Sequence, residues 1–270
     1  MTPRLLPTWV VTFAAATALA ACGGSANPSA SEATSSAPSG TSSTASLSGT
    51  VTVFAASSLQ EAFTTMKKQF EAGHPGVTVT PNFGASSALA QQITQGAPAD
   101  VFASASQMNM DQVVQAGAAA TSQPFAKNVM EIAVPPANPA FISTLSDLAK
   151  PGLKVALCQA QVPCGSVAAK VLANANITVT PVSQEADVKA VLTKVQLGEV
   201  DAGVVYVTDV RAAGDKVKGV PIPNDVNAST SYPIVALKKA PNPDGAAAFV
   251  AYVLSSDGQQ VLRAGGFAAP

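Results

Sequence analysis

Two short stretches of the chain combine small residues and serines at nearly the same spacing. They read VFAASSL at positions 53–59 and FGASSAL at positions 83–89. Each pattern predicts a strand that runs through a small turn into the start of a helix. A helix start presents unpaired backbone N–H groups and the positive end of the helix dipole, and serine hydroxyls add further donors. Two such turns in one domain indicate a site that holds an anion with uncharged donors.

The charge of the chain agrees with a site of this kind. The 270 residues carry a net charge of -1, and only 11% of them are charged. No basic stripe of the kind that binds nucleic acid is present, so nucleic acid is not an expected partner. Attraction of an anion must therefore come from local dipoles, because the chain has no strong positive field.

The N-terminal residues have the pattern of an export signal. Arg4 is followed by an apolar run over residues 9–21, too short for a good membrane span, and then by LAAC at positions 19–22. This pattern resembles a bacterial lipoprotein signal. It predicts a signal peptide at 1–21, a lipid on the sulfur of Cys22, and a protein exported and anchored to the outer face of the cell membrane. An uncleaved anchor or an ordinary secretory signal would also export the chain.

The segment 22–47 is nearly all Ser, Ala, Thr, Gly and Pro after its first cysteine. Such a composition buries too little apolar surface to offset its ordering entropy, so a flexible tether is expected. The roughly 220 residues that follow are enough for one large core or for two lobes.

Two cysteines, Cys158 and Cys164, remain after Cys22 is assigned to lipid. A pair this close in an exported protein is expected to form a disulfide, which would fix the shape of the loop between them. A metal or redox pair is the alternative. The chain has one histidine and no C-x-x-C motif, which disfavours that alternative.

Strands and helices alternate along the rest of the chain. Strands are expected at 51–54, 77–83, 100–103, 129–134, 154–158, 202–207 and 232–237, and helices at 58–73, 88–95, 108–116, 146–149, 165–175, 185–197, 245–254 and 258–264. Ser58 and Glu61 fit a capping box at the start of the first helix. The alternation predicts an α/β fold with parallel sheets covered on both faces, in which ligands bind beyond the carboxyl ends of the strands.

Several motifs in order over residues 50–268 resemble those of the periplasmic molybdate-binding proteins of bacterial ABC importers. They are the two serine turns, GAPADVF at 96–102, VPCG at 162–165, Asp187-Val188, GVVY at 203–206 and GGF at 265–267. The resemblance implies a type II periplasmic-binding-protein fold, in which two α/β lobes are joined by two crossover strands and the ligand lies in the cleft. Lobe 1 would comprise 48–127 plus 233–270, and lobe 2 would comprise 128–232.

The same resemblance implies the residues of the ligand site. Hydroxyl groups would come from Ser58, Ser86 and Tyr206, and backbone N–H groups from Cys164 and Val188. Ser57 and Ser87 are possible additional contacts. The family often has alanine at the position of Cys164, a departure that puts the local loop shape in doubt and that a bridge to Cys158 would compensate.

A donor-only site suits a tetrahedral oxyanion that carries two charges and no proton. Protonated phosphate would need an acceptor for its own hydrogen, and sulfate has shorter bonds than a cavity sized for molybdate requires. Together with this chemistry, the resemblance implies a receptor that binds molybdate, and also tungstate, and delivers it to the transmembrane subunits of an ABC permease. The chain is expected to be monomeric, to need no cofactor, and to hold molybdenum only as bound molybdate.

Two alternatives remain for the function. The nearer one is a receptor for sulfate or another tetrahedral oxyanion on the same fold. The remote one is an exported serine hydrolase, but the only histidine is His74 and no G-x-S-x-G motif is present, so the chain is expected not to be an enzyme. His74 is interpreted as a solvated loop residue. Asp100 and Asp187 are expected to shape a strand entry and a helix start, and not to meet the anion.

Overall fold

A computed structural model describes residues 46–270 of the chain. The predicted signal peptide, Cys22 and the tether as far as residue 45 lie outside the described residues. No helix within residues 46–270 is both long enough and apolar enough to span a membrane.

The strands are β1 (Gly49–Ala56), β2 (Val77–Gly84), β3 (Val101–Ala103), β4 (Gln123–Val134), β5 (Val155–Cys158), β6 (Ser183–Glu185), β7 (Ala202–Tyr206), β8 (Lys218–Pro221) and β9 (Ser229–Ala236). The α-helices are α1 (Gln60–Gly73), α2 (Ser86–Thr94), α3 (Gln107–Gln115), α4 (Pro163–Asn174), α5 (Val188–Gln196), α6 (Val207–Ala213), α7 (Pro243–Leu254) and α8 (Ser256–Ala264). Short 3-10 helices cover Ser57–Leu59, Leu145–Ala149 and Gly214–Lys216.

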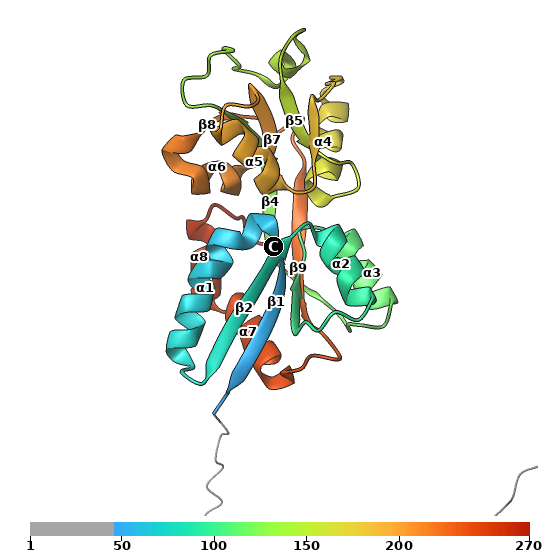
Figure 1. The fold of residues 1–270 in the computed structure, drawn as a ribbon, viewed down its shortest axis with the longest axis vertical. Helices are drawn as coiled ribbons and strands as arrows, with labels where there is room; N and C mark the ends of the chain where they lie inside the picture. The colour runs from blue at the N-terminus through green and yellow to red at the C-terminus, as the bar shows by residue number, and fades with distance from the viewer. Residues whose placement is uncertain (1–45) are drawn as a thin grey trace, which may run out of the picture. The chain divides into compact units, whose positions relative to one another are not determined.

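The nine strands pair in the order β2-β1-β3-β9-β4-β7-β5-β6, and β8 pairs with β4. We call the part built on β2, β1, β3 and the end of β9, with α1–α3, α7 and α8, lobe 1. The part built on β7, β5, β6, β8 and the end of β4, with α4–α6, is lobe 2. Figure 1 shows the two lobes one above the other, with β4 and β9 running between them.

The two long strands β4 and β9 make the sheet mixed. β1 is parallel to β2 and β3, and β5 is parallel to β6 and β7, as the alternation predicts. In contrast, β9 is antiparallel to β3 and to β4, and β4 is antiparallel to β7 and β8. The parallel pairing expected from the alternation therefore holds for β1–β3 and for β5–β7, but not for the pairs made by β4 and β9. Strands that carry the chain from one lobe to the other are not followed by a returning helix, so they need not be parallel.

Each lobe has its own apolar core. In lobe 1, Phe63 and Phe70 are buried and pack edge to face against Phe249, with ring centroids 5.9 and 5.3 Å away. The apolar residues of α1 recur every three or four positions, at Ala62, Phe63, Met66 and Phe70, and they are buried there. Lobe 2 is filled mainly by Val, Leu, Ile and Ala side chains. A second cluster in lobe 1, with Phe54, Leu89 and Phe102, packs beneath α2 and α3. Because no cluster is shared between the lobes, each lobe can act as a rigid body on its side of the crossover strands.

Some elements differ from the sequence-based expectation. Helix α6 follows β7 without a loop and was not predicted, and neither were the short strands β6 and β8. The helix expected at 185–197 begins only at Val188, because residues 183–185 pair with β5. Edge strands of three or four residues leave too short a pattern to detect.

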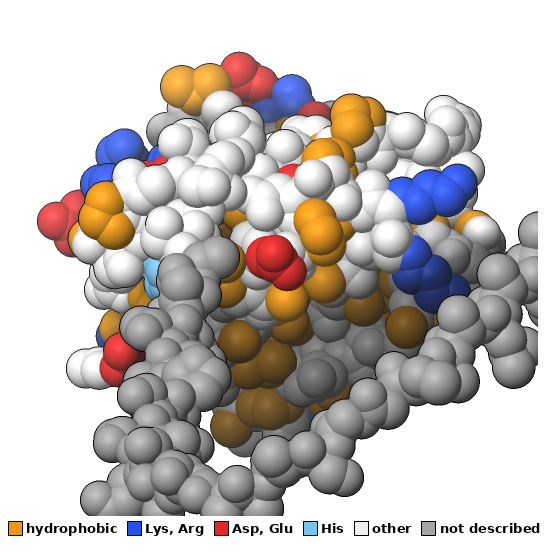
Figure 2. Space-filling view, turned by 90° about the horizontal axis from the view of Figure 1, so that it is seen from below, with side chains coloured by type: hydrophobic (Ala, Val, Ile, Leu, Met, Phe, Trp, Pro, Cys, Tyr) orange, Lys and Arg blue, Asp and Glu red, His pale blue; other side chains and the backbone are white. Residues whose placement is uncertain are grey.

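The surface of the described part carries few charges on the face seen in Figure 2. There, Lys and Arg side chains and Asp and Glu side chains lie in small separate groups among polar and apolar ones. This agrees with the low charge of the sequence.

Candidate anion-binding site

The two serine turns lie side by side at one edge of lobe 1. β1 and β2 are parallel and in register, so that Ala56 pairs with Gly84 at their carboxyl ends. Ser58 therefore follows one strand at the same level at which Ser86 follows the other. Ser86 is the first residue of α2, and Ser58 lies in the 3-10 turn that precedes α1. Both side chains are buried.

The turn before α4 brings backbone donors from lobe 2. Pro163 is the first residue of α4 and Cys164 the second, so the N–H of Cys164 has no acceptor within the helix. The predicted disulfide joins Cys158 at the end of β5 to Cys164. Gly165 is required next to it, because a Cβ there would lie 1.9 Å from the carbonyl oxygen of Gln159. The bridged loop thus sets where α4 begins.

Two further elements of lobe 2 complete the site. Asp187 caps α5 by accepting hydrogen bonds from the N–H groups of Lys189 (2.8 Å) and Ala190 (3.1 Å), as its predicted role at a helix start requires. The N–H of Val188, the first residue of α5, has no acceptor within that helix. Tyr206 ends β7 and is 1% exposed.

These groups surround a small cavity between the lobes. It is lined by Ala56, Ser57, Ser58, Ala85, Ser86, Ala105, Pro163, Cys164, Asp187, Val188 and Tyr206. The structure thus brings together all five predicted ligand positions and also Ser57. Ser87 does not line the cavity. Asp187 does line it, although its Oδ1 is occupied by the helix that it caps.

The hydroxyl groups of the cavity are arranged as donors. Ser86 Oγ accepts a hydrogen bond from the N–H of Ala105 (2.9 Å), which leaves its proton for another acceptor. Tyr206 Oη is buried and has no hydrogen-bond partner among the described residues. A buried polar group without a partner is unfavourable unless a ligand supplies one. Burial raises the pKa of Tyr206 well above its ordinary value, and the neighbouring Tyr232 and Asp209 raise it further. The hydroxyl of Tyr206 therefore keeps its proton.

The capping box predicted for Ser58 is wrong. Ser58 makes no capping hydrogen bond, and its Oγ lies 2.9 Å from the hydroxyl of Tyr232 in β9. Glu61, the other predicted member of the box, contacts lobe 2. A tertiary partner 174 residues away has replaced the local one.

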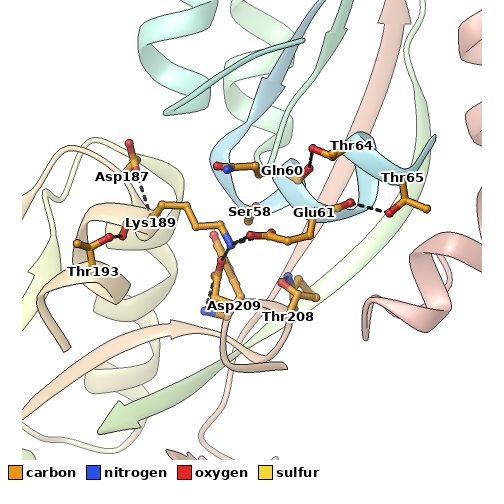
Figure 3. A network of polar contacts seen from close by, with 12 residues as sticks. Ser58, Gln60, Glu61, Thr64, Thr65, Asp187, Lys189, Thr193, Thr208 and Asp209 are labelled. Carbon is orange, nitrogen blue, oxygen red and sulfur yellow. Dashed lines mark hydrogen bonds and ion pairs between the residues drawn. The ribbon is translucent and has the colours of Figure 1, made fainter. Parts of the chain in front are cut away.

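Glu61 forms an ion pair across the cleft, shown in Figure 3. Lys189 Nζ on α5 lies 2.8 Å from Glu61 Oε2 on α1 and 3.1 Å from Asp209 Oδ1 on α6, the second contact lacking hydrogen-bond geometry. Asp209 Oδ2 in turn accepts from the N–H of Tyr206 (3.1 Å). Burial lowers the pKa of Lys189, but Asp209 and Glu61 outweigh it and raise that pKa overall. This chain of contacts links lobe 1 to the backbone of Tyr206.

Three residues that lie behind the cavity, Tyr232, Asn128 and Lys189, have no role in the prediction from the sequence. Asp100 has the expected structural role: it is buried and accepts from the N–H groups of Thr52 (2.7 Å) and Asn242 (2.6 Å). His74 lies in the loop after α1, as interpreted, but it is half-buried and stacks on Phe70 with ring centroids 4.3 Å apart, so it is not fully solvated.

Two α/β lobes, two crossover strands and a donor-lined cavity between them define a two-lobed binding protein. Comparison with known proteins agrees. The model of the bacterial extracellular solute-binding proteins matches residues 51–268, and the chain belongs to this family.

Individual relatives cover most of the chain. It is 45% identical over 221 residues to the molybdate-binding protein ModA of Mycobacterium tuberculosis, covering 82% of this chain and 85% of that protein. It is 33% identical over 230 residues to the putative ABC transporter substrate-binding lipoprotein YvgL of Bacillus subtilis, covering 82% of this chain and 86% of that protein.

Solved structures show the same fold. The substrate-binding domain of a putative molybdenum ABC transporter from Clostridium difficile is 31% identical, with a TM-score of 0.63, covering 82% of this chain and 99% of that one. The periplasmic molybdate-binding protein of Azotobacter vinelandii is 19% identical, with a TM-score of 0.72 and the same coverage of both chains. At that identity, the second comparison supports the fold alone.

Proposed function

We propose that the chain is an extracytoplasmic receptor that binds molybdate and delivers it to an ABC permease. One observation carries the proposal: the hydroxyls of Ser58, Ser86 and Tyr206 meet the N-terminal ends of α4 and α5 around a single cavity. No Lys or Arg side chain lines that cavity. The names of the Mycobacterium and Clostridium relatives support molybdate as the ligand.

The chemistry of the cavity favours an anion without a proton. Ser86 already accepts a backbone N–H, and Tyr206 is buried as a neutral phenol, so each has a proton to give. Backbone N–H groups of Cys164 and Val188 can only donate. Ser57 is a further candidate donor, since it also lines the cavity. A fully deprotonated dianion accepts all of these bonds, whereas a proton on the anion finds no acceptor among these five donors. The carboxylate of Asp187 also lines the cavity, and its Oδ1 already accepts from the N–H groups of Lys189 and Ala190.

Binding is proposed to hold two lobes together. Lobe 1, at 48–127 plus 233–270, supplies the two serines, and lobe 2, at 128–232, supplies Cys164, Val188 and Tyr206. An anion that bonds to both lobes favours the closed arrangement over an open one.

The attachment of the receptor is part of the proposal. Lipid on Cys22 and a tether over 22–47 would hold the domain at the outer face of the membrane, near the transmembrane subunits of the permease. The name of the Bacillus relative, a lipoprotein, supports this arrangement. We further propose that the receptor acts as a monomer, that it also takes tungstate, and that it catalyses no reaction.

A thermal-unfolding panel tests the ligand. The exported chain is heated with molybdate, tungstate, sulfate or phosphate at equal concentration. Molybdate and tungstate at a thousand times their Kd should stabilise the fold by about 4 kcal/mol, which raises Tm by about 10 °C. Sulfate and phosphate should shift Tm much less. A large shift with sulfate and none with molybdate would favour the sulfate receptor instead.

The proposed site residues are tested by single substitutions. Ser58→Ala, Ser86→Ala and Tyr206→Phe should each weaken molybdate binding by about 1.5–3 kcal/mol, since each removes a hydrogen bond to a charged group. Ser87→Ala is the matched control, because Ser87 lies beside Ser86 but does not line the cavity. Titration calorimetry measures the affinities. If all four variants bind like the wild type, the site lies elsewhere.

A further inference from the structure

Tyr232 lies behind the proposed site, in the crossover strand β9. Its side chain is fully buried. Three aromatic rings surround it edge-on, those of Phe125, Tyr206 and Phe267, with centroids 5.4–6.3 Å away. This packing leaves the ring one position, and its hydroxyl lies 2.9 Å from Ser58 Oγ. Burial raises the pKa of Tyr232, so the hydroxyl carries its proton.

Asn128, in the other crossover strand, fixes the role of that hydroxyl. Asn128 Oδ1 accepts the backbone N–H of Val129 (3.0 Å), which determines the orientation of the amide. Its Nδ2 then donates to Thr208 Oγ1 (2.8 Å) and to Tyr232 Oη (3.4 Å). Tyr232 Oη is therefore an acceptor toward Asn128.

Counting protons gives the direction of the remaining bond. Tyr232 has one hydroxyl proton, and its hydrogen-bond contacts among the described residues are Asn128 and Ser58. The hydroxyl of the neighbouring Tyr206 makes no hydrogen bond with it. The amide of Asn128 donates, so it cannot receive the phenol proton. If Ser58 also donated to Tyr232, that proton would be buried without an acceptor, which is costly. Tyr232 therefore donates to Ser58 Oγ, and the proton of Ser58 is left for the cavity.

We propose that Tyr232 is a positioning residue that makes Ser58 an obligate hydrogen-bond donor to the bound oxyanion, through the relay from Asn128 to Tyr232 to Ser58. This inference rests on the proposed function, since it assumes that Ser58 contacts the anion. It deepens that function by assigning the basis of selection: with its oxygen accepting from Tyr232, the Ser58 hydroxyl meets the ligand with its proton, which suits an oxyanion that only accepts. Ser86 is held in the same way by the N–H of Ala105, but only the Tyr232 bond depends on a side chain.

A double-mutant cycle tests the relay. Tyr232→Phe should weaken molybdate binding about tenfold, because Ser58 loses both its orientation and the polarisation of its hydroxyl. In a Ser58→Ala background, the same substitution should change molybdate affinity less than about twofold, since its effect acts through that hydroxyl. A purely structural role would give similar losses in both backgrounds. Calorimetric titration with molybdate gives the four affinities.

Two further variants distinguish a loss of affinity that acts through the relay from one that follows the loss of any tyrosine hydroxyl. Tyr252→Phe removes another tyrosine hydroxyl of lobe 1, one bonded to Gln69 outside the site, and should leave molybdate affinity unchanged. Asn128→Leu should give a loss smaller than that of Tyr232→Phe, again absent in the Ser58→Ala background. If Tyr232→Phe does not fold, Asn128→Leu replaces it in the double-mutant cycle with Ser58→Ala.

Selectivity provides a second readout. In Tyr232→Phe, Ser58 Oγ is free to accept a proton from the ligand, so competition by phosphate against molybdate should become stronger at pH 7. In Tyr252→Phe it should stay as in the wild type. Additive losses in the cycle, or unchanged competition by phosphate, would overturn the relay while leaving a molybdate receptor intact. A wild-type chain that binds neither molybdate nor sulfate would overturn both the relay and the proposed function.

Discussion

Among single residues, Asp209 has the most unusual surroundings. Its side chain is fully buried beneath Tyr206, and burial, partly offset by Lys189, raises its pKa to about 6. A carboxyl group whose pKa is higher in the folded state than in the unfolded state binds more protons when folded. Its contribution to stability therefore declines as the pH rises from about 4 to about 6.

The Asp209→Asn variant isolates this contribution. The free energy of unfolding of the wild type, relative to that of Asp209→Asn, should fall as the pH rises from 4.5 to 7, because the neutral amide does not titrate. Urea unfolding at the two pH values measures the difference. Equal differences at both pH values would mean that Asp209 titrates in the fold as an ordinary carboxyl group.

The roles predicted for single residues were right where the hydrogen-bond partner is a nearby backbone group. They were wrong where the partner is a side chain far away in the sequence. Asp187 caps its helix as expected, because both partners lie within three residues. Ser58 has an equally good local pattern, yet it bonds to Tyr232, which no spacing rule connects to it. The direction of hydroxyl protons in the site depends on such distant partners and could not be derived from the sequence.

At the scale of elements, the start of α4 shows how a short loop positions a donor. The loop between Cys158 and Cys164 is closed by the disulfide, and Gly165 allows the carbonyl of Gln159 to approach the helix closely. The loop therefore has little freedom to move the N–H of Cys164 away from the cavity.

Removal of the disulfide should lower both stability and affinity. In the Cys158→Ser, Cys164→Ser double variant, the free energy of unfolding should fall by about 2 kcal/mol, the value expected for a short closed loop. Molybdate affinity should fall as well, because the N–H of Cys164 loses its fixed position. Thermal unfolding and titration calorimetry measure the two effects. Lower stability with unchanged affinity would mean that the bridge serves the fold alone.

The helices and strands that were predicted correctly are those whose periodic pattern of apolar residues extends over many positions. The first helix buries the face that its periodicity indicates, and the strand–helix alternation gave the α/β class. The antiparallel pairing of β4 and β9 left no signal in periodicity, because pairing direction does not alter which residues are buried. Helix α6 was missed since it begins at the residue after β7, without any loop.

At the scale of the whole described domain, the ion pair between Glu61 and Lys189 joins the lobes near the cavity. Glu61 is half exposed, so the pair contributes at most about 1 kcal/mol in water. The interaction exists only when the lobes are together, so it adds to the apparent affinity for any ligand that requires closure.

Glu61→Gln tests this contribution. Molybdate affinity should fall by up to about fivefold at low salt, and the difference should shrink at high salt as the pair is screened. Glu199→Gln is the matched control: its side chain is similarly exposed and pairs with Lys194 within lobe 2. Equal affinities for the two variants, measured at both salt concentrations, would show that the ion pair does not favour closure.

The path of the chain through the sheet also sets the order in which the domain can be completed. Lobe 2 is made from one continuous stretch, but lobe 1 needs β9, α7 and α8 from the end of the chain to pack against β3 and α1. During synthesis, the segment with Ser58 emerges first, yet the core beneath α1 lacks Phe249, Val253 and Leu262 until the last residues arrive. A chain cut short before α7 would thus lose part of the core that supports the Ser58 turn, while the cluster beneath α2 and the Ser86 turn is made entirely from earlier residues.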